Sequence, residues 1–254
     1  MVTVTSDQLA AFREHGFVVI PGVLDERSLA CGHRIATAML TAEPAPTDHA
    51  GPYFLWPRFA PAADGAAEHG MLRFYRGCGV RDLAEQLLRP EVSPDDPDFA
   101  QLATTVPPWP RRPGGPHVDG LSPPLPDGQP GTFSLLAGVW LTGHEEQNRG
   151  NLWVWPGTHR RAAAWLAEQG PDALSRLQPQ LSYPPVELGE PRQLTGPAGS
   201  VLLAHYLLGH NIGGHDGPAG APSRQVVYYR LQARGHRARW REAVTDPLAE
   251  FRDP

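Results

Sequence analysis

From about residue 100 onward, the chain consists of short apolar runs separated by Gly, Pro and Asn. The runs are "FAQLATTV", "TFSLLAGVWLT", "NLWVW", "PVEL", "SVLLAHYLL" and "RQVVYYRLQ". Each has the length of a strand and is bounded by turn-forming residues. This pattern predicts a mainly β protein with a jelly-roll or sandwich core over about residues 100–235. Two stretches inside it, "RRAAAWLAEQG" and "PDALSRLQ", predict helical insertions at about 160–178.

Outside the core, the pattern is mainly helical. Residues 1–99 predict a helix that Ser6 caps and Gly16 ends, a short strand "FVVI", and a longer helix from Asp25 to about Thr41. The breaker-rich stretch 42–70 predicts a long loop, interpreted as a lid, and "VRDLAEQLLRP" predicts another helix. A closing helix is expected over 236–254. We therefore expect one domain spanning 1–254.

Composition narrows the class of partner. The net charge is −5, no block of like charges occurs, and no apolar stretch approaches the length of a membrane span. The first residues lack the basic-then-apolar layout of a signal peptide. We expect a cytoplasmic protein that binds a small molecule, not nucleic acid or a membrane, and that is either a monomer or a homodimer. Two cysteines are too few for a disulfide framework.

The segment "GGPHVDG" places His117 and Asp119 two positions apart, so on an extended segment both side chains point the same way. Two His and one carboxylate on one face of an Fe(II) ion leave positions open for a co-substrate and O₂. Such a short motif also arises by chance. A third ligand must come from a later strand, and "GSVLLAHYLLGHNIGGH" offers His205, His210 and His215.

Context distinguishes these histidines. His205 lies inside an apolar run, which favours a buried core residue, and His215 lies in a Gly-rich loop, where we expect exposure to solvent. His210 stands where the strand runs out into glycine, as a ligand at the mouth of a barrel would. A competing pair, His144 and Glu146 in "GHEEQ", is interpreted as part of a solvated loop.

Five segments in order make the chain similar to a known family. They resemble successive motifs of the phytanoyl-CoA dioxygenase-like (PhyH) Fe(II)/2-oxoglutarate oxygenases. In chain order, the segments are "LAAFREHGFVVIPGVLD", "PHVDG", "RGNLWVWPGTHR", "GSVLLAHYLLGH" and "RARWREAVTDPLAEF". The resemblance implies a double-stranded β-helix (jelly-roll, cupin-like) core. It also implies Fe(II) held by His117, Asp119 and His210, with 2-oxoglutarate and O₂ as co-substrates.

The resemblance implies an arginine for the distal carboxylate of 2-oxoglutarate, since a guanidinium binds carboxylates in a bidentate manner. Every basic residue of this chain is Arg, and Arg224, fourteen positions after His210, fits; Arg230 on the same strand face is the alternative. Many relatives carry Thr two residues after the Gly of "RGNLWVW", where this chain has Leu152. Ser134 and Thr104 are candidate replacements for that hydroxyl.

The resemblance further implies an enzyme that hydroxylates a C–H bond of a small metabolite and releases succinate and CO₂. The carboxylate of Asp119 favours hydroxylation over halogenation, which needs a small residue there. Trp56 in the expected lid, and Trp109 and Arg112 just before the His-x-Asp motif, are candidate substrate-binding residues. The alternative is a metal-binding cupin-type barrel with an isomerase, storage or ligand-binding role.

Overall fold

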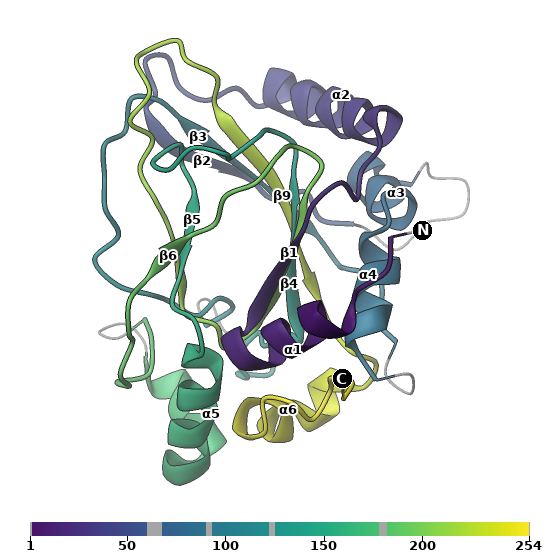
Figure 1. Ribbon diagram of the computed structural model, residues 1–254, viewed down its shortest axis with the longest axis vertical. Coiled ribbons are helices and arrows are strands. Elements are labelled where there is room, and N and C mark those ends of the chain that lie inside the picture. Colours follow the sequence, from purple (N-terminus) through teal and green to yellow (C-terminus); the bar gives the residue numbers. More distant parts are fainter. Residues whose placement is uncertain (1, 60–67, 90–92, 122–124, 178–181, 254) are drawn as a thin grey trace.

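Two antiparallel β-sheets form the centre of the molecule (Figure 1). The computed structural model describes residues 2–59, 68–89, 93–121, 125–177 and 182–253. The larger sheet has the order β1-β7-β4-β9-β3-β2 and the smaller one β6-β5-β8. Their strands are β1 (Phe17–Ile20), β2 (Gly51–Leu55), β3 (Ala100–Val106), β4 (Leu135–Trp140), β5 (Leu152–Val154), β6 (Arg192–Gln193), β7 (Val201–His205), β8 (His210–Ile212) and β9 (Arg224–Leu231).

Helices cover the outer face of the larger sheet and one end of the molecule. They are α1 (Ser6–His15), α2 (Glu26–Ala42), α3 (Gly70–Gly77), α4 (Val80–Leu87), α5 (Thr158–Gln169) and α6 (His236–Thr245), with a 3₁₀ helix, η2 (Pro171–Leu177). In Figure 1, α2, α3 and α4 lie on the side of the larger sheet that faces away from β5 and β6. This two-sheet arrangement is the jelly-roll core expected from the apolar runs.

The larger sheet is buried on both faces, which explains why its strands are almost continuously apolar. Along β9, Val227 and Tyr229 belong to the core beneath the helices, whereas Val226 and Tyr228 belong to the core between the two sheets. Successive side chains of a strand point to opposite faces, so one strand supplies both cores. β4 runs antiparallel to both β7 and β9 and places its own residues in the same two layers.

Local signals predicted most element bounds well. α1 and α2 begin and end within a residue or two of the prediction; the cap of α1 is Thr5, not Ser6, and Gly16 ends it with φ +84°. The stretch 42–70 is not a loop throughout, because Gly51–Leu55 pairs with β3, and α3 begins at its end. Residues 60–67 of the expected lid lie outside the described residues. "PVEL" forms no strand.

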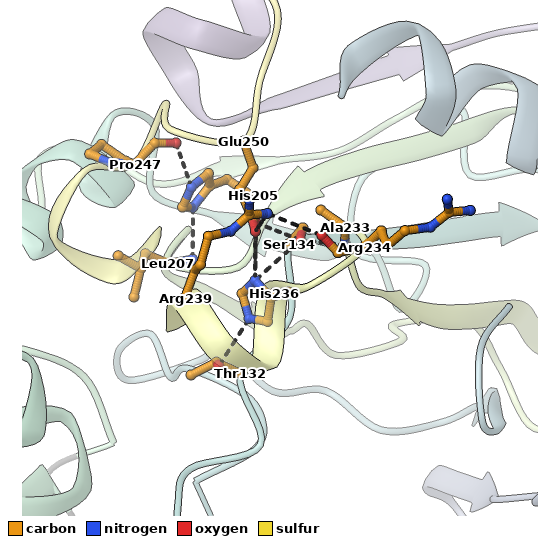
Figure 2. A network of polar contacts seen from close by, with 10 residues as sticks. All are labelled: Thr132, Ser134, His205, Leu207, Ala233, Arg234, His236, Arg239, Pro247 and Glu250. Atoms are coloured by element: carbon orange, nitrogen blue, oxygen red, sulfur yellow. Dashed lines mark hydrogen bonds and ion pairs between the residues drawn. The ribbon is translucent and has the colours of Figure 1, made fainter. Parts of the chain in front are cut away.

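A buried polar network fastens the C-terminal segment to the barrel (Figure 2). Nδ1 of His236, the first residue of α6, lies 3.0 Å from the Glu250 carboxylate, and its Nε2 lies 3.0 Å from Thr132 Oγ1. The hydroxyl of Ser134 donates to Glu250 at 2.6 Å and accepts from the Ala233 amide. These buried polar groups therefore satisfy one another, as such groups must away from water.

Within the described part of the chain, no helix combines the length and the apolar character that crossing a bilayer requires.

Candidate metal centre

His117, Asp119 and His210 lie together although 91 positions separate the last two. His210 begins β8, and the amide of His117 donates to the carbonyl of His210 at 3.0 Å, which ties the His-x-Asp loop to that strand. The two imidazole rings lie 4.5 Å apart between centroids. One nitrogen or oxygen atom from each of the three residues lies within 4.8 Å of the others. The structure thus brings together the three residues that the sequence pattern suggested.

The hydrogen bond of His210 orients its ring. Its Nδ1 lies 2.9 Å from the carbonyl oxygen of Leu208, and because a carbonyl only accepts, Nδ1 carries the proton. In the neutral ring, Nε2 is therefore the unprotonated nitrogen, and it faces Asp119 Oδ2 at 3.8 Å. A histidine ligand of a metal commonly donates its other N–H to such a backbone acceptor, which fixes the ring for coordination.

The ionisation states of His117, Asp119 and His210 depend on one another because the three side chains lie close together. Burial opposes ionisation of Asp119, but the nearby imidazoles of His117 and His210 and the charge of Arg230 hold its pKa well below the ordinary value. Burial and the neighbouring His210 lower the pKa of His117. For His210, burial favours the neutral ring, yet the nearby Asp119 carboxylate outweighs it and raises the pKa. An ionised carboxylate between two imidazoles is a donor set suited to a divalent cation.

A cavity opens beside the three residues. Its wall is mainly apolar, with a few polar groups, and consists of Phe54, Gln101, Ala103, Leu136, Leu152, Ile212, Arg224 and Tyr228, together with His117, Asp119 and His210. Ligand sites of proteins typically combine an apolar lining with few, well-placed polar groups. The cavity therefore provides a space in which a small molecule contacts the candidate metal ligands.

Arg224 is the buried cation of this cavity. Its side chain is 2% exposed, and Nη2 donates to Tyr228 Oη at 2.8 Å. Nε and Nη1 are buried, and within the described residues neither has a hydrogen-bond partner. No carboxylate of those residues lies within 4.0 Å of the guanidinium. A buried charge whose hydrogen-bond donors are unused raises the free energy of the fold unless a ligand of opposite charge neutralises it and accepts those hydrogen bonds.

Two glycines make room for Arg224 and its partner. A Cβ atom at Gly150, whose φ is +82°, would lie 2.9 Å from Arg224 Cδ and 3.0 Å from Thr105 Cβ. A Cβ atom at Gly138 on β4 would lie 2.7 Å from the Tyr228 ring. The Gly of the "RGNLWVW" motif is thus required by the close approach of the arginine, a reason that the sequence alone did not reveal.

The candidate substrate-binding residues lie apart from the cavity wall. Arg112 is exposed and forms an ion pair with Asp216 at 3.2 Å, and the Trp109 ring packs over Gly51. Trp56 is 47% exposed and stacks with Arg230 at the rim, 5.6 Å from ring centroid to Cζ. Of the three, only Trp56 therefore lies near the three candidate ligands, through Arg230.

Two other histidines differ from expectation. His215 is buried, not exposed, because its backbone pairs with Trp109 and its Nε2 lies 3.2 Å from the Pro222 carbonyl. His144 is also buried, whereas its neighbour Glu146 is solvated as predicted. His205 is a core residue, as expected, with Nε2 2.9 Å from the Pro247 carbonyl (Figure 2).

Neither candidate replacement for the missing Thr hydroxyl reaches the cavity. Ser134 belongs to the network around Glu250. Thr104 points to the opposite face of β3 from Ala103, which lines the cavity. Leu152 does line it, so at this wall an apolar contact takes the place of the hydroxyl.

Sequence reasoning missed Gln101 and Tyr228 as cavity residues. The signal for Tyr228 was available, because it lies four positions after Arg224 on the same strand and therefore on the same face. Phe54, an aromatic residue of the expected lid, reaches the cavity because β2 pairs with β3.

Fold and site together define a double-stranded β-helix protein with a two-histidine, one-carboxylate cluster. A family model described as phytanoyl-CoA dioxygenase (PhyH) matches residues 12–220. This chain belongs to the phytanoyl-CoA dioxygenase family, which confirms the resemblance of its motifs. No curated protein sequence matches the chain at a significant level.

Solved structures share the fold. The carbocyclase SnoK from nogalamycin biosynthesis is 20% identical with a TM-score of 0.57, covering 92% of this chain and 90% of its own. The epimerase SnoN from the same biosynthesis is 19% identical with a TM-score of 0.60, covering 89% and 82%. EctD from S. alaskensis, solved with bound Fe, is 20% identical with a TM-score of 0.57, covering 91% and 77%. At these identities the similarity concerns the fold.

Proposed function

We propose that this protein is a non-haem Fe(II)/2-oxoglutarate-dependent oxygenase that hydroxylates a C–H bond of a small-molecule metabolite. The observation that carries the proposal is that the His117, Asp119 and His210 cluster shares one cavity with Arg224, a buried arginine that has no carboxylate partner among the described residues. A metal-binding cupin of another function has no need of such an arginine.

The donor atoms fit an iron site. His117, Asp119 and His210 would supply two imidazole nitrogens and one carboxylate oxygen, the set found in non-haem Fe(II) oxygenases. The backbone acceptor at Leu208 leaves Nε2 of His210 free for the metal. SnoN has been solved in complex with Fe³⁺ and α-ketoglutarate, and EctD with 2-oxoglutarate, which supports the same cofactor pair here.

Arg224 would bind the distal carboxylate of 2-oxoglutarate. Its unused Nε and Nη1 donors and its lack of a carboxylate partner among the described residues are what such a role requires. The hydroxyl of Tyr228 holds the guanidinium from the other side at 2.8 Å. A planar fork held in this way is prepared for bidentate binding before the ligand arrives.

With both groups bound, Fe(II) and 2-oxoglutarate would supply the O₂-dependent oxidation that yields an alcohol, succinate and CO₂. The chain itself would hold the reactants together and exclude water through the apolar wall of Ala103, Leu136, Leu152 and Ile212. Because the position of the carboxylate ligand carries Asp119 and not a small residue, we propose hydroxylation and not halogenation.

Anaerobic spectroscopy tests the proposal. Wild-type protein mixed with Fe(II) and 2-oxoglutarate without O₂ should develop the weak visible charge-transfer band of the chelate. Asp119→Ala should lose hydroxylation, measured as substrate-stimulated release of succinate, whereas the matched variant Asp216→Ala, outside the cavity, should keep it. Absence of the band in folded wild-type protein would favour a cupin-type metal or ligand-binding barrel instead.

A further inference from the structure

Arg230 is a second cation beside the candidate metal ligands, next to the cavity and not part of its wall, and the proposed function leaves it without a role. It lies six positions after Arg224 on the same face of β9, and its Nη2 lies 3.3 Å from Asp119 Oδ2. Its side chain is 21% exposed, so the guanidinium is reached from solvent. Among the described residues, Asp119 is the only carboxylate within 4.0 Å of this guanidinium.

Aromatic rings surround this guanidinium. Its Cζ lies 5.6 Å from the ring centroid of Trp56 and 5.5 Å from those of Phe99 and Phe133. These contacts fix a long side chain that would otherwise be mobile. One side of the Arg230 guanidinium faces Asp119, and the other side remains available to a ligand.

Two exposed aromatic side chains, Phe54 and Trp56, lie near Arg230 and the cavity. They are the only exposed large hydrophobic side chains of the described chain, at 38% and 47%, and their ring centroids lie 6.4 Å apart. Phe54 also lines the cavity. Two neighbouring exposed aromatic side chains beside a cavity offer a surface on which a ring system can pack.

The charges at the site do not balance without the substrate. Asp119 contributes one negative charge, and Arg224 and Arg230 contribute two positive charges. Under the proposed function, Fe(II) and the 2-oxoglutarate dianion cancel each other, so one positive charge remains. A low-dielectric site disfavours an uncompensated charge and favours a ligand that neutralises it.

We propose that Arg230 determines substrate specificity by binding a carboxylate of the substrate, whose aromatic or other apolar ring system packs on Phe54 and Trp56. The substrate class is thus an apolar carboxylic acid that presents a C–H bond to the metal centre. This inference rests on the proposed function, because the charge count includes its two cofactors.

A matched pair of probes tests the assignment. Calorimetry under anaerobic conditions, with Fe(II) and saturating 2-oxoglutarate, would compare 2-naphthoate with its uncharged amide, 2-naphthamide. Saturating 2-oxoglutarate keeps the probe from Arg224. Wild-type protein should bind the carboxylate at least about tenfold more tightly, as expected for a charge-assisted hydrogen bond. Arg230→Gln should abolish this preference, and Arg230→Lys, which keeps the charge without the fork, should retain part of it.

Arg241→Gln is the matched control, because it removes an exposed arginine that pairs with Asp172 outside the cavity wall and should leave the preference intact. Equal binding of the two probes by the wild type, failure to bind the carboxylate, or an unchanged preference in Arg230→Gln would overturn the inference. So would loss of the Fe(II)/2-oxoglutarate band in Arg230→Gln, which would make Arg230 a positioning residue for Asp119. The wild-type band reports on the proposed function, so either proposal can fail alone.

Discussion

Replacing Arg224 by Met should stabilise the metal-free protein and weaken 2-oxoglutarate binding at the same time. In the unliganded fold, the guanidinium is 2% exposed and leaves two buried nitrogen donors unpaired. Each buried unsatisfied donor costs about 1–3 kcal/mol, and the hydrogen bond to Tyr228 returns about 1 kcal/mol. Met has a similar length and no donors, so Arg224→Met should raise the free energy of unfolding by about 2 kcal/mol.

That increase corresponds to a rise in Tm of about 4–8 °C for a chain of this size. The affinity of Arg224→Met for 2-oxoglutarate should fall. Removing one partner of a desolvated charge pair costs about 2–5 kcal/mol, which is a loss of affinity of about 30-fold to several thousand-fold. Arg224→Lys should fall between Met and the wild type, because it keeps a point charge and loses the planar fork.

The assay has two parts. Thermal unfolding of metal-free protein measures stability, and anaerobic titration of the Fe(II)-loaded protein with 2-oxoglutarate measures affinity through the charge-transfer band. Arg149→Met is the matched control, because Arg149 pairs with the exposed Glu146 at 2.7 Å and should alter neither quantity greatly. A destabilised Arg224→Met variant with unchanged 2-oxoglutarate affinity would refute the reasoning and make Arg224 a structural residue.

Two further predictions concern stability. Glu250→Ala should lower the free energy of unfolding by about 3 kcal/mol in urea denaturation, because it leaves buried partners of the Glu250 network uncompensated; a loss below about 1 kcal/mol would contradict this. Burial lowers the pKa of His159 to about 4 and of His144 to about 2. Both stay neutral in the fold at pH 5, whereas in the unfolded chain they ionise near pH 6.5. The unfolded state then binds more protons, so stability should fall as the pH drops below 6.5, by about 4 kcal/mol between pH 7.5 and 5.0 for the two groups. Equal stability at both values would show that these rings ionise in the fold.

The sequence by itself determined the elements and the local part of the site. Short apolar runs predicted most of the strands, and capping residues such as Asp25 and Gly16 predicted helix ends within a residue or two. The pairing of His117 with Asp119 was also local, since positions two apart share one side of an extended segment. These features depend on neighbours along the chain, which the sequence displays directly.

Only the tertiary structure decided what lies beside that pair. Strand pairing brings His210 to His117 and leaves His205 in the core and His215 in a buried backbone contact. The same long-range pairing turned 51–55 from a predicted loop into β2. The packing of distant glycines and aromatic rings decides which arginine is buried without a carboxylate partner among the described residues and which lies partly exposed beside Trp56, and no local pattern carries this information.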